Sequence, residues 1–169
     1  NLLFNHFFGN LMAQIPMTRN GLEAIKKELQ ILKSVDRPKI IEAIAEARAQ
    51  GDLSENAEYE SAKERQAFIE GRIAEIEAKI SQAEVIDPAS INADGRCVFG
   101  STVELEDLDD EMKAKYQIVG DDESSIKDNK ISINSPLAKA LIGKEEGDIV
   151  EFETPGGLKN YEILKVSYV

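Results

Sequence analysis

A regular spacing of apolar residues in the first half of the chain limits the possible fold more than any other feature. Between residues 59 and 83, seam residues recur at alternating intervals of three and four: Tyr59, Ala62, Gln66, Ile69, Ile73, Ile76, Ile80 and Ala83. These intervals keep one stripe of a helix apolar over more than three heptads, which is typical of a coiled coil. A helix with so narrow an apolar stripe needs a partner helix to cover it.

The segment before this helix has the pattern of the partner. Thr18 is a suitable N-cap for a helix with a similar stripe, formed by Leu22, Ile25, Leu29 and Leu32. Pro38 interrupts the pattern, and we expect a kink there. The stripe then resumes in a shifted phase at Ile41, Ile44 and Ala45. The short joint around Gly51 makes the two helices run antiparallel.

The composition changes at residues 85–92, where Asp87-Pro88 ends the helical pattern. The second half has strand-like segments at 96–105, 115–119 and 130–134, followed by a short helix at 135–141. A hairpin pairs residues 148–153 with 160–166 across a Pro-Gly-Gly turn. We therefore expect an α+β chain. A long antiparallel coiled-coil arm occupies residues 12–86, and a small antiparallel sheet domain with one helix occupies residues 87–169.

Charge and residue counts exclude several classes of function. The 169 residues include 20 Lys and Arg against 32 Asp and Glu, a net charge of −12, which argues against sequence-independent binding to free DNA or RNA. One cysteine, Cys97, and one histidine, His6, cannot assemble the usual zinc ligand sets or a Cys/His or Ser/His/Asp nucleophile system.

The sequence gives no sign of a membrane protein. It has no stretch near the roughly 18 consecutive apolar residues of a membrane span. Residues 1–11 lack the basic residues and the small-residue cleavage site of a secretory signal, and we interpret them as an upstream extension. We expect a cytoplasmic protein.

The joint between the two helices, QGDLSENAEY, carries two carboxylates three residues apart, Asp52 and Glu55. On a helical turn, residues at this spacing share a face and can reach one cation. The same spacing is also that of a capping box, with Asp52 as the N-cap and Glu55 at N3. Mg²⁺ prefers six oxygen ligands, so two carboxylates alone make an incomplete site. If they hold a metal, another molecule must supply further ligands.

Several stretches in order resemble the Gre transcript cleavage factors, a family of bacterial transcription elongation factors. They are RPKIIEAIAEARAQ, GDLSENAEY, INSPLAKALIGKEEGDIVEF and TPGGLKNYEILKV, and the resemblance runs from about Met12 to Val169. It implies an antiparallel coiled coil followed by an FKBP-like globular domain. In this family the globular domain binds the rim of the secondary channel of bacterial RNA polymerase, and the coiled coil enters the channel.

The resemblance also implies an activity and a partner. Such a factor is not itself an enzyme; it stimulates the polymerase to cut the extruded RNA 3′ end in backtracked or arrested complexes. The family's functional acidic pair matches Asp52 and Glu55, which help to hold a second Mg²⁺ shared with polymerase carboxylates and to orient the attacking water. No tight metal site is expected in the isolated protein, which we expect to be a monomer.

Two basic residues beyond the joint, Lys63 and Arg65, resemble the family's small basic spot that contacts the RNA 3′ segment. Alternatively, they belong to a solvated helix face paired with Glu60 and Glu64. Tyr59 lies at a seam position and is interpreted as a packing residue rather than as a contact to RNA or polymerase. No extended basic stripe is visible, which is typical of the less basic subgroup of the family.

Three other functions remain open. A channel-binding inhibitor of polymerase without cleavage activity differs chiefly in its tip acids, so the presence of both Asp52 and Glu55 argues against it. A peptidyl-prolyl isomerase is suggested by the FKBP-like expectation, but its pocket needs an aromatic lining. A purely structural coiled-coil dimer is distinguished from the expected monomer by sedimentation.

Overall fold

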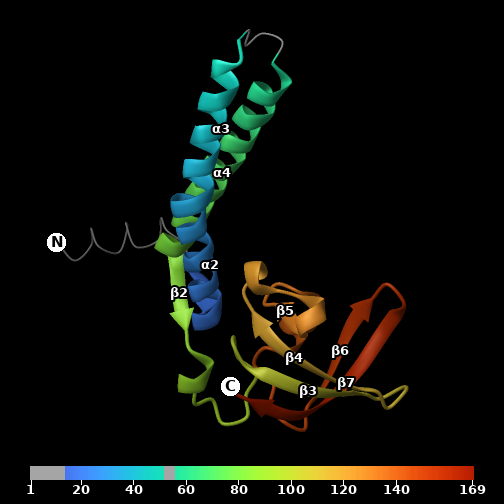
Figure 1. The fold of residues 1–169 in the computed structure, drawn as a ribbon. Coiled ribbons are helices and arrows are strands. Elements are labelled where there is room, and N and C mark those ends of the chain that lie inside the picture. Colours follow the sequence, from blue (N-terminus) through green and yellow to red (C-terminus); the bar gives the residue numbers. More distant parts are fainter. Residues whose placement is uncertain (1–13, 52–55) are drawn as a thin grey trace, which may run out of the picture. The chain divides into compact units, whose positions relative to one another are not determined.

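The computed structural model describes residues 14–51 and 56–169, which form two units (Figure 1). The coiled-coil unit contains Leu22–Ala83, and the globular unit contains Gln14–Gly21 together with Glu84–Val169. Residues 14–21 and 84–86, which the sequence pattern places in the arm, thus belong with the globular unit. No helix in the described ranges is long and apolar enough to cross a membrane.

The coiled-coil unit is built from two antiparallel helical segments (Figure 1). The first consists of α2 (Arg19–Ile31), the π-helical turn η1 (Leu32–Asp36) and α3 (Arg37–Ala49); the second is α4 (Ala57–Gln82). Their shared core contains the expected seam residues of α4 together with residues of the first segment: Leu32, Ile40, Ile44, Ala62, Ile69, Ile73 and Ile76. The coiled coil predicted from the apolar spacing is confirmed.

The interruption expected near Pro38 is a π-helical turn. Continuing the three-four repeat from Leu32 without interruption would bury positions 39, 43 and 46, but the buried residues are Ile40, Ile44 and Ala47, each one position later. A π-turn accommodates one extra residue, which explains the shift. The predicted seam positions Ile41, which is 53% exposed, and Ala45, which is also exposed, are therefore wrong. Pro38 lies in the first turn of α3, directly after the π-helical turn.

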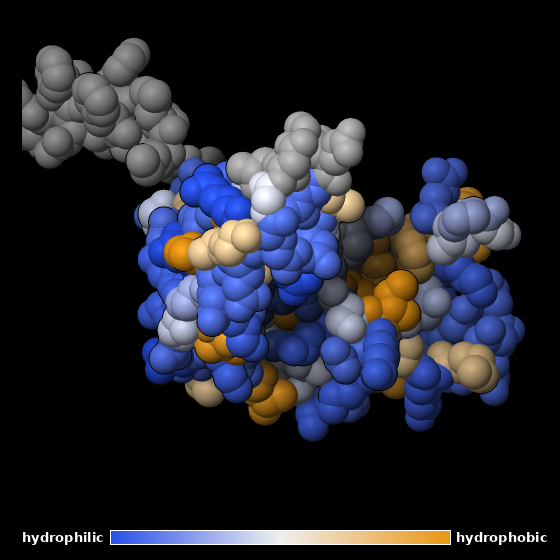
Figure 2. All heavy atoms as spheres, turned by 45° about the horizontal axis from the view of Figure 1, so that its top comes forward, coloured by the Kyte–Doolittle hydropathy of each residue, from blue (hydrophilic) through white to orange (hydrophobic). Residues whose placement is uncertain are grey.

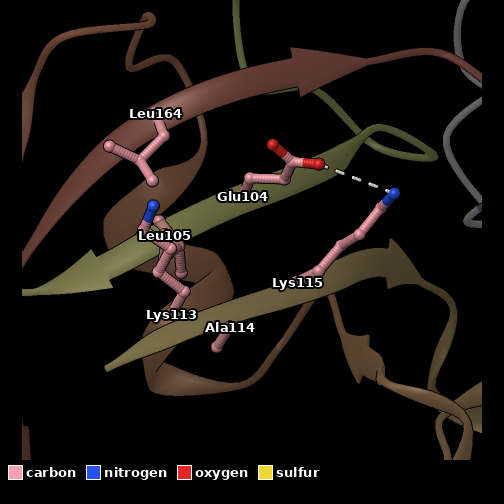
Figure 3. A pocket seen from close by; sticks show the side chains of 6 residues that line it. All are labelled: Glu104, Leu105, Lys113, Ala114, Lys115 and Leu164. Carbon is pink, nitrogen blue, oxygen red and sulfur yellow. Dashed lines mark ion pairs between the residues drawn. The ribbon is translucent and has the colours of Figure 1, made fainter. Parts of the chain in front are cut away.

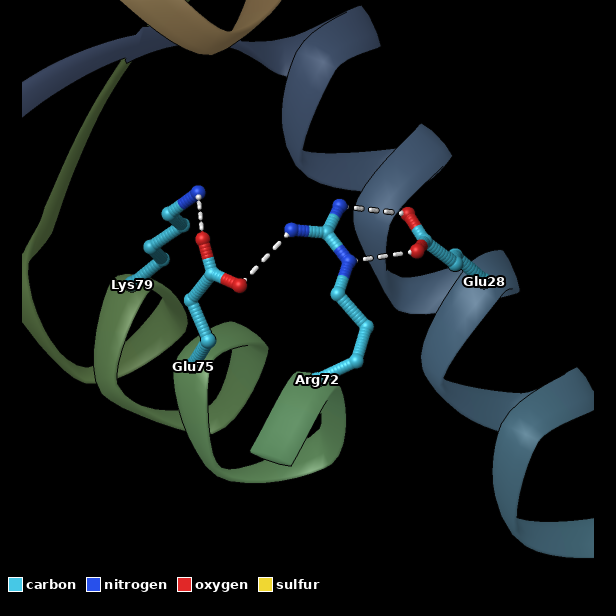
Figure 4. Close-up of polar contacts among 4 residues, drawn as sticks. All are labelled: Glu28, Arg72, Glu75 and Lys79. Atoms are coloured by element: carbon cyan, nitrogen blue, oxygen red, sulfur yellow. Dashed lines mark hydrogen bonds and ion pairs between the residues drawn. The ribbon is translucent and has the colours of Figure 1, made fainter. Parts of the chain in front are cut away.

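Ion pairs join the two helical segments along their length. Arg72 of α4 makes a two-point contact with Glu28 of α2, at 2.7 and 3.0 Å, and a third contact with Glu75 at 3.1 Å (Figure 4). Glu75 in turn accepts from Lys79 at 2.9 Å. The hydrogen bond from Arg72 holds the pKa of Glu28 below its ordinary value of 4.5. The pKa of Glu75 is also lowered, mainly by its hydrogen bond from Lys79 and secondly by that from Arg72.

The lowered carboxylate pKa values predict a pH dependence of stability. A carboxylate with a depressed pKa in the folded state stabilises the fold above its unfolded pKa, and the contribution is lost as pH falls through the folded value. The urea midpoint of the coiled-coil unit should therefore fall as pH drops below about 4.5. Arg72→Met removes the shared cation and should flatten this dependence. Identical pH profiles for the wild type and Arg72→Met would contradict this role of the pair.

The globular unit contains two sheets. β1 (Ile15–Thr18) and β2 (Ala83–Ile86) form a two-stranded sheet. The second sheet has the order β5-β4-β3-β7-β6. Its strands are β3 (Thr102–Asp107), β4 (Lys113–Val119), β5 (Lys130–Ser132), β6 (Ile149–Thr154) and β7 (Gly157–Ser167).

The five-stranded sheet is mixed, so the expectation of a purely antiparallel sheet is wrong at one edge. The chain leaves β4, passes through the 3₁₀ turns η3 (Asp121–Glu123) and η4 (Ile126–Asp128), and returns in the same direction, so β5 pairs parallel with β4. The strand expected at 96–105 begins only at Thr102. Before it the chain makes a turn, with Gly100 at φ +86° and the Ser101 hydroxyl donating to the Val98 carbonyl at 2.6 Å.

One helix packs on this sheet, as expected. It is α5 (Pro136–Leu141), capped by the side chain of Ser135, which accepts from the N–H of Ala138. The 3₁₀ turn η2 (Pro88–Ser90) follows β2. The core beneath the helix consists of buried apolar residues from several elements: Cys97, Val103, Leu105, Ile118, Ala138, Leu141, Val150, Ile163 and Val166.

Glu123 of η3 ties the N-terminal segment into the globular unit. Its carboxylate accepts from the N–H of Thr18 at 3.0 Å and from that of Gly120 at 3.2 Å, and the Thr18 hydroxyl donates to its other oxygen. A Cβ at Gly21 would lie 2.3 Å from this carboxylate, so a larger residue there would displace the Glu123 side chain from these hydrogen bonds. The Thr18 hydroxyl also accepts from the N–H of Gly21, which confirms Thr18 as the expected N-cap of α2.

Candidate functional site

The two helices of the coiled-coil unit are fastened together where the joint between them begins and ends. The Asn56 side-chain oxygen accepts from the N–H of Tyr59 at 3.0 Å, which caps α4. Its side-chain nitrogen donates to the carbonyl of Ala47 in the last turn of α3 at 2.9 Å. A single amide side chain therefore caps the start of α4 and adds a second hydrogen bond to a carbonyl at the end of α3, which also accepts from the Gln50 N–H at 3.3 Å.

The position of this cap decides between two interpretations of the acidic pair. Because α4 begins at Ala57 and is capped by Asn56, the predicted capping of the second helix by Asp52 is wrong. Asp52 and Glu55 lie outside the described residues. The cap of α4 requires neither carboxylate, so their interpretation as a functional pair no longer competes with a capping role in that helix.

Asn56 is expected to matter for stability. Asn56→Ala removes both hydrogen bonds and should destabilise the coiled-coil unit by about 1–2 kcal/mol. Asn56→Asp keeps the capping oxygen and loses the donor to Ala47, and it should fall between the wild type and alanine. Urea denaturation followed by circular dichroism at 222 nm measures both changes. Equal stability of Asn56→Ala and the wild type would show that the two contacts contribute nothing.

Tyr59 packs against the core of the coiled coil, which confirms its interpretation as a packing residue. The Arg48 guanidinium lies over its ring, 5.9 Å from the centroid. This contact joins the last turn of α3 to the first turn of α4, and it adds a second link beside that made by Asn56.

The two basic residues predicted to contact RNA do not share a face. Residues two positions apart on a helix point in different directions. Lys63 donates to the side-chain oxygen of Gln66 at 3.2 Å. Arg65 lines a groove on the unit together with Asp36 and Phe68. Among the contacts of the described residues, neither Lys63 nor Arg65 forms an ion pair with Glu60 or Glu64, although the alternative interpretation expects one. Their contact with RNA stays a prediction.

The described residues offer no cluster of three or more His, Cys, Asp or Glu side chains that could hold a metal ion. Metal binding by Asp52 and Glu55 also stays a prediction. Two carboxylate-bearing residues are fewer ligands than Mg²⁺ needs, so the donor set fits a shared site rather than a complete one. Cys97 is buried, and burial raises the pKa of its thiol to about 11, so it is a core residue and not a ready nucleophile.

A hollow of about 330 Å³ lies on the five-stranded sheet (Figure 3). Glu104 and Lys115 form an ion pair across it, with 3.7 Å between nitrogen and oxygen. The lining residues are Glu104, Leu105, Lys113, Ala114, Lys115 and Leu164. None of these side chains is aromatic, so this hollow does not provide the lining that the isomerase alternative needs.

Two family models together match nearly all of the described chain. A model described as "Transcription elongation factor, N-terminal" matches residues 15–85, and one described as "Transcription elongation factor, GreA/GreB, C-term" matches residues 92–168. These ranges correspond to the helical and the mixed halves of the chain. The chain belongs to the GreA/GreB family of transcription elongation factors.

Two individual relatives, both transcription elongation factors, support the same assignment. The chain is 61% identical to the transcription elongation factor GreA of Neisseria meningitidis serogroup A, over 94% of this chain and 100% of the relative. It is 60% identical to the GreA of Ralstonia nicotianae, over 94% and 100%. A solved structure, that of GreA factor homolog 1 of Thermus thermophilus, is 28% identical and covers 90% of this chain and 98% of its own, with a TM-score of 0.42.

Proposed function

We propose that this elongation factor binds bacterial RNA polymerase and stimulates the polymerase's own cleavage of the RNA 3′ end in backtracked or arrested complexes. The observation that carries the proposal is the joint of the coiled coil in a member of this family. Asn56 fastens both helix ends, and in the sequence it directly follows the segment with the two carboxylate-bearing residues that match the family's functional pair. The coiled coil enters the secondary channel, and the joint reaches the polymerase active site.

Asp52 and Glu55 would act there as partial ligands of a Mg²⁺ shared with the polymerase. When bound, the ion supplies a water of lowered pKa and stabilises developing negative charge. The two carboxylates add negative charge and oxygen ligands at a place where polymerase carboxylates alone leave the second ion weakly held. They also position the attacking water by accepting hydrogen bonds from it. The isolated protein binds no metal tightly, because two carboxylate-bearing residues do not complete the shell.

The remaining parts of the chain would support this task. The globular unit docks at the rim of the secondary channel, and it supplies most of the affinity. Lys63 and Arg65 lie in the part of α4 that follows the joint, where either can meet the phosphates of the extruded RNA 3′ segment. The factor acts as a cytoplasmic monomer, and the covalent chemistry belongs to the polymerase.

The direct test is RNA cleavage in a halted, backtracked polymerase complex carrying 5′-labelled RNA. Adding the protein should shorten the RNA at a rate well above that of polymerase alone, in a reaction that requires Mg²⁺. Binding with inhibition of elongation and no cleavage would replace the proposal with the inhibitor alternative. Absence of any binding would overturn it altogether.

A further inference from the structure

A groove runs along the coiled-coil unit between the first helical segment and α4. Two adjoining hollows of about 460 and 220 Å³ form it, and Asp36 and Arg65 line both. The floor is apolar and consists of three buried core residues, Leu32, Ile40 and Ile69.

Phe68 forms one wall of this groove with its ring largely in water. The residue is 72% exposed, the largest exposed fraction of any bulky apolar residue on the described coiled coil. It is not part of the seam, so its exposure is not a consequence of a frayed core. The face in Figure 2 is mostly hydrophilic with several apolar areas. A single exposed apolar residue is ordinary on a protein surface, so Phe68 is of interest because it lines a hollow together with apolar core residues.

The groove coincides with the π-helical turn. Leu32 and Asp36 are the first and last residues of η1, and both line the larger hollow. The one-residue shift made by this turn places Ile40 in the seam and in the smaller hollow. π-turns inside α-helices occur frequently at functional sites. A π-turn, an apolar floor and an exposed aromatic ring thus meet on one side of the unit.

The charges around the groove indicate which kind of molecule can bind in it. The rim carries two acidic residues, Asp36 and Glu64, and two basic residues, Lys39 and Arg65. The rim therefore has no excess of positive charge, which a groove that binds a strand of RNA along its length needs. An apolar centre with a rim of mixed charge is the usual anatomy of a protein interface, in which aromatic residues and arginine are enriched.

We propose that this groove receives an apolar side chain from a polypeptide segment of RNA polymerase, packed between Phe68 and the floor. The inference rests on the proposed function, because it requires the coiled coil to lie inside the secondary channel. Phe68 is 12 residues beyond Asn56, about 18 Å along the helix, so its partner flanks the coiled coil at some distance from the active site. Phe68 therefore contributes to binding and not to the cleavage step.

The test compares Phe68→Ala with the wild type and with Ile41→Ala. Ile41 is a matched control, since it is a large exposed apolar residue of the same unit that does not line the groove. Phe68→Ala should raise the concentration needed for half-maximal cleavage about 10-fold and leave the rate at saturation unchanged. The ratio of the half-maximal concentrations of Phe68→Ala and the wild type should be the same at low and at high salt. Ile41→Ala should match the wild type in both quantities.

A cross-linking experiment identifies the occupant. A photoreactive benzoylphenylalanine at position 68 should capture a polymerase polypeptide, and the same residue at position 41 should not. Capture of RNA, capture of a second copy of this chain, or equal capture at both positions would overturn the inference. If Phe68→Ala binds polymerase as tightly as the wild type, the inference about the groove is wrong and the proposed function is unaffected. If the wild type does not bind polymerase, the proposed function itself is wrong.

Discussion

Replacing Asp52 with serine is expected to lower stimulated RNA cleavage by roughly 10²-fold or more, the scale of losing a positioned group that stabilises the transition state. Binding to polymerase should survive, because α4 takes its cap from Asn56 and the change removes no described contact. Glu55→Gln is the companion change, since it keeps nearly the same shape and removes the charge. Both variants should compete with the wild type and act as inhibitors of rescue.

The matched control for these variants is Glu58→Gln. Glu58 is an exposed carboxylate in the first turn of α4, close to the joint but outside the proposed pair. The Glu58→Gln variant should stimulate cleavage at a rate within about twofold of the wild-type rate. Full stimulation by Asp52→Ser would show that the Asp52 carboxylate has no role in cleavage. An equal loss with Glu58→Gln would show that negative charge near the joint matters in general and that the pair has no special role.

Truncating Ile76 to alanine is expected to unfold the coiled-coil unit at lower denaturant than any surface change. Ile76 is fully buried in the seam, and removing a buried isoleucine to alanine costs about 2–5 kcal/mol. The globular unit has a separate core and should keep its hydrogen-exchange protection. Cleavage stimulation should fall as the coiled coil unfolds, while docking by the globular unit remains.

Hydrogen exchange resolved along the chain measures this division. Amides of α3 and α4 should lose protection in Ile76→Ala, and those of β3 and β7 should not. Ile41→Ala, at an exposed position of the same unit, should change stability by under about 0.5 kcal/mol. Equal loss of protection in both units would show that they fold as one cooperative body.

The seam of α4 could be predicted residue by residue because a heptad repeat determines which face a helix buries. The seam of the first segment could be predicted up to Leu32 and again at Ile44, but not at Ile40 and Ala47. The π-turn that follows adds one residue to the helix. No residue pattern within the segment predicts this turn, because its energetic cost is offset by packing against α4. Likewise the parallel pairing of β5 depends on how the chain returns through η3 and η4, which the strand pattern alone does not specify.

The candidate site shows a similar division. The acidic pair is readable from its spacing and from the family resemblance. The N-cap of the second helix cannot be read from the sequence, because Asp52, Ser54 and Asn56 are all good N-caps within five positions; in the structure it is Asn56. The sequence does not identify Phe68 as a candidate binding residue, because an aromatic residue off the seam can be interpreted only together with the neighbouring groove, which the structure shows.

The central claim is that the two carboxylates complete a metal site inside the polymerase. The measurement that tests it most directly is the cleavage rate of a backtracked complex as a function of Mg²⁺ concentration, with and without the protein. The wild type should lower the Mg²⁺ concentration for half-maximal rate, and Asp52→Ser and Glu55→Gln should abolish that shift. A Mg²⁺ dependence that is the same with the wild type, with either variant and with polymerase alone would contradict the account.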